Sequence, residues 1–314
     1  MKYEKGFSYV KRERQNLLWD LAFLTPQFII FFTLTILPFL ISIPILLTDQ
    51  IGFIDNDIDF VGLKNFVSIF QYPLVDSFYS AVKRTIIFTI INYATVYIFG
   101  MTLALLMYEI KSRWKKPFFT IIYLPYMISG LGIGLIMLLL FSRDTGSLNL
   151  LLLKLGLIEN AVDIKDPRVS SWLFPLMVGW RYAGFNMAIF LGGLLAIPTE
   201  TIHASRVDGA NYLQRLRHIY FPQMSASIIV ATVLCLIGSW GVFDEAVGMG
   251  ALTSNSNVRF FSILLFKIGF AGSGASQSGT LAEAMAMSMT INIPLLIVGI
   301  LLGRLQQKFN AYME

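Results

Sequence analysis

The 314-residue sequence contains a single cysteine and only two histidines. Cys235 has no second cysteine for an intrachain disulfide, and its place in an apolar run is typical of a buried thiol. His203 and His218 lie far from that cysteine, so no metal-ligand spacing is present and we expect no metal site. The long apolar runs also lack a pair of carboxylates. A membrane-bound enzyme with a clustered catalytic site is therefore not expected.

Charged residues are scarce as well. They make up 14% of the chain, against roughly 25% in soluble domains, whereas 56% of the residues are hydrophobic. The apolar residues form blocks long enough to cross a bilayer, which takes about 20 residues per helix. The formal net charge of +5 does not indicate a nucleic-acid partner, because in membrane proteins the distribution of Lys and Arg carries the information. The composition predicts an all-α polytopic membrane protein embedded in a lipid bilayer.

Hydropathy predicts six transmembrane helices. Their expected bounds are 21–47, 81–109, 117–141, 172–197, 223–243 and 281–303. The first run is far longer than the apolar region of about 7–15 residues in a signal peptide, so we expect it to remain as a span. The predicted organisation is an N-terminal segment at 1–20, a six-helix transmembrane domain at 21–303 and a C-terminal tail at 304–314.

The distribution of charge predicts the orientation. Lys and Arg are more frequent in the segments that lie on the same side of the membrane as the N-terminus. Acidic residues gather in the first loop on the opposite side. These acidic residues are Asp49, Asp55, Asp57, Asp59 and Asp76. Since basic segments stay in the cytoplasm, both termini are expected there, which agrees with an even number of spans.

A polar segment, residues 198–222, separates the fourth and fifth spans on the basic side. Thr199 is expected to cap its first helix. Gly209 comes where that helix would end, because glycine accepts the left-handed backbone conformation. Asn211 is expected to cap a second helix that runs to Pro222. From charge and periodicity alone, this segment is an interfacial loop that rests on anionic lipid.

The spacing within the segment resembles the cytoplasmic signature loop of binding-protein-dependent ABC importer permeases, E-A-A-x3-G-x9-I-x-L-P. Here the matching positions are His203-Ala204-Ser205, Gly209, Ile219, Tyr220, Phe221 and Pro222. The Asp-Gly-Ala that follows the first helix resembles the carbohydrate branch of that family, the maltose/oligosaccharide type (type I). The resemblance implies a short cytoplasmic coupling helix between the fourth and fifth spans.

Three positions depart from the family pattern. His203 replaces the glutamate, Ser205 the second alanine and Phe221 the leucine. In the family that acid belongs to the face that meets the ATPase subunit, so the substitution leaves the detailed contact open. Glu200 lies one turn earlier on the same helix face and can supply an acid instead.

Further stretches of the chain are similar to the family. They are "FVGLKNF" after the first span, "TIIYLPYMISGLGIGLIMLLLF" with the following Gly-Ser-Leu-Asn, and "VFDEAVGMGALT" after the fifth span. The Gly-Gly-Pro that the sugar branch usually carries in the last region is absent, which leaves the geometry of that loop open.

The resemblance implies a transport subunit that performs no chemistry of its own and binds no cofactor. ATP and Mg would be bound by separate ABC ATPase subunits. Its other partners would be a second homologous permease subunit, an extracytoplasmic solute-binding protein and a carbohydrate substrate, with an oligosaccharide favoured. The implied location is the bacterial cytoplasmic (inner) membrane. The loop at 200–215 would dock on the ATPase through Glu200, His203, Ala204, Asp208, Gly209 and Arg215.

The substrate path is expected along the fourth and fifth spans, which line the cavity in the family. Sugar rings stack on aromatic side chains, and their hydroxyls need fixed polar partners in a mostly apolar cavity. The residues that offer this chemistry are Tyr182, Phe185, Asn186, Ser239, Trp240 and Phe243. An aromatic stripe of this kind is also typical of packing between helices or of an aromatic belt at the membrane interface. Arg181, a charge near a span end, is open to three interpretations: snorkelling, pairing, or contact with an acidic sugar.

A secondary transporter of a small polar solute is the alternative. Such a protein is expected to show inverted repeats, broken helices and ion ligands at the midplane. The sequence shows no repeat, and Glu283 is its one candidate intramembrane acid.

Overall fold

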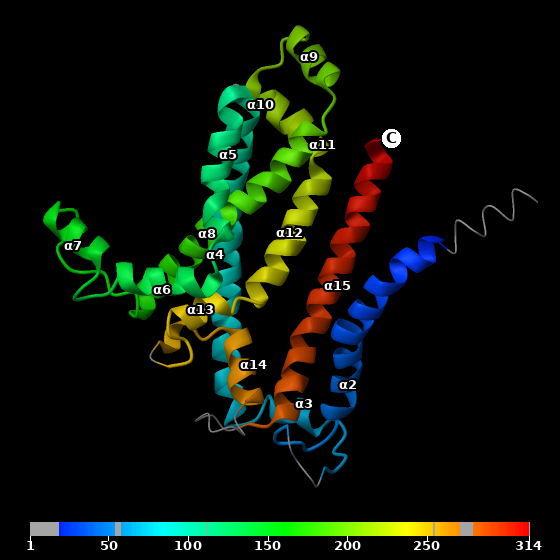
Figure 1. Cartoon of the computed structure of the whole chain (residues 1–314), viewed down its shortest axis with the longest axis vertical. Coiled ribbons are helices and arrows are strands. Elements are labelled where there is room, and N and C mark those ends of the chain that lie inside the picture. Colours follow the sequence, from blue (N-terminus) through cyan, green and yellow to red (C-terminus); the bar gives the residue numbers. More distant parts are fainter. Residues whose placement is uncertain (1–18, 54–57, 111, 254, 271–278, 314) are drawn as a thin grey trace, which may run out of the picture.

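The computed structural model describes residues 19–53, 58–110, 112–253, 255–270 and 279–313. In these ranges the chain is mostly helical, and the sole β-type pairing is an isolated bridge between Thr48 and Phe60. The long helices run roughly side by side, with α9 (Thr199–Val207) at one end and α3 (Lys64–Ser68) at the other (Figure 1). The prediction for residues 1–18 of the N-terminal segment lies outside the described residues.

Three described helices are long and apolar enough to cross a membrane, namely Trp19–Ile45, Leu74–Glu109 and Leu281–Lys308. Three further candidates are pairs of helices with a sharp bend at a short break. The pairs are Arg113–Met127 with Gly130–Leu140, Pro167–Leu195 with Thr199–Val207, and Tyr212–Gln223 with Ser225–Trp240. The described chain therefore has six candidate spans if each bent pair is one span. The second of the long helices, α4, begins at Leu74, earlier than the predicted span at 81–109.

The prediction of one continuous helix at 117–141 is wrong. The segment divides into α5 (Ser112–Met127) and α6 (Gly130–Leu140), which meet at 89°. Ser129 between them has an extended backbone, with ψ 140°. A close helix crossing helps to hold α6 in this direction, because a Cβ at Gly134 would lie 2.3 Å from the backbone oxygen of Glu245 in α13 (Asp244–Gly248).

The centre of the bundle is the packing of α4 (Leu74–Glu109) on α8 (Pro167–Leu195). Small residues permit this approach, as is common between membrane helices. A Cβ at Gly179 would come within 2.5 Å of the Thr95 side chain, and one at Gly184 within 2.3 Å of the Ile122 carbonyl oxygen in α5. Both glycines of α8 therefore fix the distance to neighbouring helices.

The first helix, Trp19–Ile45, lies at the edge of the bundle beside α15 (Leu281–Met313) (Figure 1). None of its most apolar stretch is buried. It contains a π-helical turn, η1 (Phe32–Ile36), followed by α2 (Leu37–Ile45). Pro38 has no N–H to donate into the preceding turn, which favours this local rearrangement. At the other end of the chain, α15 continues through the predicted tail to Met313.

Shorter elements connect the long helices. They are α3 (Lys64–Ser68), α7 (Ser147–Lys154), α13 (Asp244–Gly248), η3 (Ser256–Val258) and α14 (Phe261–Gly269). The polar segment forms α9 (Thr199–Val207), α10 (Tyr212–Arg215), η2 (Leu216–Tyr220) and α11 (Phe221–Gln223), and leads into α12 (Ser225–Trp240).

Candidate functional site

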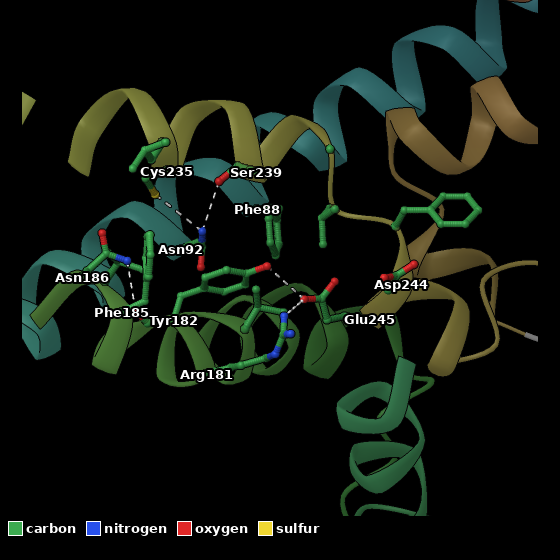
Figure 2. Close-up of a pocket in the computed structure, with 17 residues that line it drawn as sticks. Phe88, Asn92, Arg181, Tyr182, Phe185, Asn186, Cys235, Ser239, Asp244 and Glu245 are labelled. Carbon is green, nitrogen blue, oxygen red and sulfur yellow. Dashed lines mark hydrogen bonds and ion pairs between the residues drawn. The ribbon is translucent and has the colours of Figure 1, made fainter. Parts of the chain in front are cut away.

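A cavity of about 300 Å³ lies between α4, α8, α12 and the segment that leads into α13. Figure 2 shows that its walls carry both aromatic rings and polar groups. Five of the six residues predicted for the substrate path line it. They are Tyr182, Phe185, Asn186, Ser239 and Phe243. The structure thus brings together side chains of α8 with those of α12 and the residues that follow it, which the polar segment separates from α8 in the sequence.

Trp240, the sixth predicted residue, does not line this cavity. It lines a larger apolar cavity of about 830 Å³ between α12, α14 and α15. There its ring meets that of Phe261 edge-on, with the centroids 5.8 Å apart. The reason is helical geometry, since consecutive residues such as Ser239 and Trp240 point about 100° apart around a helix. Ser239 faces the first cavity and Trp240 the second.

A buried ion pair forms one wall of the first cavity. Nη1 of Arg181 in α8 contacts Oε1 of Glu245 in α13, and both side chains are largely buried. Arg181 also donates from Nη2 and Nε to the carbonyl oxygen of Ile128, at 2.8 and 3.2 Å. Its guanidinium lies 4.9 Å from the ring centroid of Tyr182. Of the three interpretations of Arg181, the structure therefore supports pairing.

Sequence reasoning did not select Glu245 as a site residue. It follows the predicted fifth span at 223–243, so the predicted topology places it in the loop after that span. The signal that points to it is the isolated arginine in the fourth span, because a buried cation requires an acidic partner nearby. Two candidates for that partner directly follow the fifth span, Asp244 and Glu245. Both line the cavity.

Asn92 is a second residue that sequence reasoning missed. Its Nδ2 donates to Oγ of Ser239 at 3.1 Å and approaches Sγ of Cys235 at 3.7 Å, which ties α4 to α12. Its Oδ1 is buried and has no hydrogen-bond donor among the described residues. The same holds for Oδ1 of Asn186, whose Nδ2 donates to the carbonyl of Tyr182 at 3.0 Å. A carboxamide inside an apolar run such as 85–107 was the available signal for Asn92.

Aromatic side chains complete the wall on the side of α8. Phe185 stacks on Tyr126 of α5, with ring centroids 4.7 Å apart and the planes inclined by 22°. Tyr126 also meets Tyr182 edge-on at 5.6 Å. The hydroxyl of Tyr182 lies 3.5 Å from Oε1 of Glu245. Aromatic faces beside a few fixed polar groups suit a ligand with apolar ring faces and several hydroxyls.

A second candidate site is the polar segment at the end of the bundle. Helix α9 ends in a Schellman motif: the N–H of Ala210 donates to the carbonyl of Ser205 at 2.9 Å and that of Gly209 to Arg206 at 3.2 Å. Gly209 has a φ of +79°, as expected of a glycine at this position. The predicted helix end at Gly209 is therefore confirmed.

The start of the second helix is also as predicted. Oδ1 of Asn211 accepts the N–H of Gln214 at 2.9 Å, and Oε1 of Gln214 accepts the N–H of Asn211 at 2.8 Å, which forms a complete capping box. The prediction that Thr199 caps the first helix is wrong. Helix α9 begins at Thr199 itself and the N-cap residue is Pro198, which has no side-chain oxygen to accept a hydrogen bond.

The segment is anchored to the bundle by buried side chains. Ile202 and Tyr220 belong to one apolar cluster with Met107 of α4 and Phe190 of α8. Ser205, which replaces a small alanine of the family pattern, is buried and donates to the carbonyl of Ile202 at 2.8 Å. These contacts join α9 to α4 and α8 as one packed unit.

Most of the residues predicted to dock on a partner are on the exposed side of this unit. Glu200, His203, Ala204, Asp208 and Gly209 are exposed. Arg215 differs, because its Nη1 donates to the carbonyl of Ala210 at 2.7 Å and its guanidinium is partly buried. Arg215 therefore supports the turn between α9 and α10 from within.

Sequence reasoning also missed two large apolar side chains on the exposed side of the segment. Val207 of α9 is 87% exposed and Leu213 of α10 is 71% exposed. The sequence offered only their position in a polar loop as a signal.

Comparisons with known proteins agree with this architecture. The chain is 28% identical to the "Probable ABC transporter permease protein YurN" of Bacillus subtilis (strain 168), over 80% of this chain and 82% of that protein. It is 25% identical to the "Arabinooligosaccharides transport system permease protein AraP" of the same organism, over 91% and 87%.

A solved structure shares the fold. It belongs to a bacterial ABC transporter involved in the import of the acidic polysaccharide alginate, and it covers 96% of this chain and 98% of its own with a TM-score of 0.77 at 21% identity. The family described as "Binding-protein-dependent transport system inner membrane component" matches residues 96–312, which include the whole polar segment. The resemblance found in residues 203–222 is confirmed, and the chain belongs to this family of ABC importer permeases.

Proposed function

We propose that this chain is one permease subunit of an ATP-driven importer that moves an oligosaccharide into the cell by alternating access. The observation that carries the proposal is the polar segment at an exposed end of the bundle. It combines the family's spacing with a Schellman motif at the end of α9 and a capping box at the start of α10. The name of the relative AraP, an arabinooligosaccharide permease, supports a carbohydrate substrate.

The cavity lined by Tyr182, Asn186 and Ser239 is this subunit's part of the sugar path. Its aromatic rings would pack on the apolar faces of pyranose rings. The buried Oδ1 atoms of Asn92 and Asn186, which lack donors among the described residues, would accept sugar hydroxyls after a small rearrangement. With about 300 Å³, this half-site suits roughly one or two sugar rings.

The exposed side of α9 would dock on the ATPase subunit. Glu200 and His203 provide polar contacts there, together with Ala204, Asp208 and Gly209. Val207 would add an apolar contact, since a valine that is 87% exposed loses unfavourable contact with water when a partner covers it. Arg215 would serve this surface indirectly by holding the turn that follows Gly209.

Movement of the docked segment would reach the sugar path through the two helices that flank it. Helix α8 carries Tyr182 and Asn186, and α12 carries Ser239. ATP binding and hydrolysis by the partner would shift α9, and its packing against α8 and α4 would pass the displacement to the cavity. This chain would then act as a mechanical coupler, with ATP and Mg bound by the ATPase.

The arrangement of the chain ends supports the proposed orientation. The C-terminal end of α15 and the Trp19 end of the first helix lie toward the same end of the bundle as α9 (Figure 1). If α9 meets a cytoplasmic ATPase, both described ends face the cytoplasm, in accord with the positive-inside rule. The sugar would enter from the opposite end, where a solute-binding protein would deliver it to a pair of homologous permease subunits.

The proposal is tested by reconstitution. The chain is copurified with its ATPase and second permease and placed in liposomes with the cognate binding protein outside. Uptake is measured across a panel of labelled oligosaccharides, with ATP or a non-hydrolysable analogue inside. ATP-dependent accumulation of one sugar class is expected. Accumulation driven by an ion gradient without ATP would contradict the proposal and favour a secondary transporter.

A further inference from the structure

A third cavity, of about 210 Å³, lies between α4 and the segment η3–α14 and is lined by three cationic side chains. They are Arg84 of α4, Arg259 just before α14 and Lys267 of α14. Ser80 contributes a hydroxyl, and no aspartate or glutamate is part of the lining. The ion pair found among the described residues joins Arg181 to Glu245. None of the three cations is therefore paired with an acidic residue that the structure describes.

The positive charges of the three side chains that line this cavity repel one another. Burial and the neighbouring guanidinium of Arg259 lower the pKa of Lys267 from its ordinary value. Nε of Arg259 donates to the carbonyl of Ala251 at 3.0 Å, which fixes the position of its guanidinium. A bound anion would reduce this repulsion and make charge-assisted hydrogen bonds with guanidinium and ammonium groups together.

The sequence of α4 gives the depth of the cavity in the membrane. Residues 85–108 contain no charged side chain, whereas Arg84 and Glu109 stand directly at the two ends of that stretch. At 1.5 Å per residue the stretch is about 36 Å long, slightly more than the hydrocarbon core of about 30 Å. Arg84 therefore lies at the level of the phosphates, in the leaflet on the side away from α9.

Exposed apolar side chains lie near two of the three cations along the chain. On α4, Ile87 and Ile90 follow Arg84 within two turns and are 39% and 64% exposed. On α14, Phe266 next to Lys267 is 37% exposed. Exposed apolar side chains are thus available close to Arg84 and Lys267 in the sequence for the acyl chains that continue from a headgroup.

We propose that Arg84, Arg259 and Lys267 form a binding site for a phosphate group, and that the phosphate belongs to an anionic phospholipid of the leaflet away from α9. The bound headgroup would connect α14 to α4 at the outer end of the bundle. This inference rests on the membrane position of the chain and holds whichever sugar the transporter carries.

The test measures the thermal stability of the purified complex in neutral detergent. Four additives are compared: short-chain phosphatidylglycerol, short-chain phosphatidylcholine, inorganic phosphate and galacturonate. The variants are the double substitution Arg84→Gln/Lys267→Gln, the charge-preserving Arg84→Lys, and Arg143→Gln/Lys154→Gln as a control that removes two exposed cations elsewhere.

Phosphatidylglycerol is expected to raise the melting temperature of the wild type, the control and Arg84→Lys by several degrees, and that of the double variant by less than half as much. Without anionic lipid, the double variant should be as stable as the wild type or more so, because it removes mutual repulsion. The double variant would then be at least as stable as the wild type without anionic lipid and less stable than the wild type with it. This difference distinguishes a loss of lipid binding from a folding defect.

Three results would overturn the proposal. An equal shift by phosphatidylglycerol in all variants would place the lipid effect elsewhere. A full shift by inorganic phosphate alone would rule out the lipid as the source of the phosphate. A shift by galacturonate and not by the phosphate compounds would replace phosphate by a sugar carboxylate.

Discussion

Arg181 of α8 and Glu245 of α13 form a buried ion pair, and the same guanidinium binds the Ile128 carbonyl at the break between α5 and α6. One side chain therefore joins three segments that lie far apart in the sequence. Because an intramembrane charge is costly without a partner, each member of this network requires the others. The network forms a wall of the proposed sugar path, so it links the packing of the bundle to the shape of the site.

Removing either partner of the ion pair should destabilise the protein. Arg181→Met or Glu245→Gln leaves a buried polar group unpaired, at an expected cost of about 3–5 kcal/mol. Thermal unfolding of the purified complex measures the loss, with Arg168→Gln as the control because Arg168 is an exposed cation on the same helix. If the control lost as much stability as Arg181→Met, the account of the pair would be wrong.

The double variant Arg181→Met/Glu245→Leu separates folding from transport. A packed apolar pair often replaces a buried ion pair without loss, so its stability should return close to that of the wild type. Transport should remain low, since the wall of the cavity has changed its chemistry. Recovery of both stability and uptake would show that the pair has a structural role alone.

The crossing of α6 and α13 should be intolerant of added volume. Gly134→Ala places a methyl group against backbone that cannot move aside, and we expect a loss of about 1–3 kcal/mol from overpacking. Gly132→Ala on the same helix is the matched control, because its nearest neighbour lies at an ordinary 3.7 Å. Equal melting temperatures for the two variants would contradict the close crossing.

Replacing Gly209 should uncouple the ATPase from uptake. Its left-handed backbone disfavours a β-branched residue by about 1–2 kcal/mol or more, so Gly209→Val should disturb the turn after α9. Gly209→Asn should retain most activity, because asparagine tolerates this conformation. The measured quantity is the ratio of sugar transported to ATP hydrolysed. A ratio unchanged in Gly209→Val would argue against a coupling role.

Substitutions in the cavity that Tyr182 lines should affect sugar uptake, whereas a substitution in the apolar cavity that Trp240 lines should not. Tyr182→Phe removes the hydroxyl near Glu245, and Asn186→Ala removes a carboxamide from the first cavity, so both should raise the substrate concentration for half-maximal uptake by several-fold. Trp240→Phe changes only the second, apolar cavity and should leave that concentration unchanged. The opposite pattern would return Trp240 to the sugar path.

Much of this architecture was predictable from local chemistry. Gly209 and Asn211 define the turn after α9 through backbone preferences that involve few neighbours, and the structure has both as expected. Apolar length located most of the candidate spans. The break between α5 and α6 escaped prediction because hydropathy does not detect a change of direction inside an apolar run.

The pairing of Arg181 with Glu245 depends on how distant helices pack. The same is true of the cavity that the Trp240 side chain lines. Asn92 was missed for the same reason, since its partner Ser239 lies on a helix far along the chain. Spacing within one helix gives the relative direction of side chains but not which neighbour each direction meets.

The most direct test of the central claim is the dependence of sugar uptake on ATP in liposomes that contain the complete complex. The account predicts that oligosaccharide accumulates only with ATP and binding protein present, and that the coupling falls in Gly209→Val while the complex remains assembled. Sugar accumulation that persists without ATP, driven by an ion gradient, would contradict it.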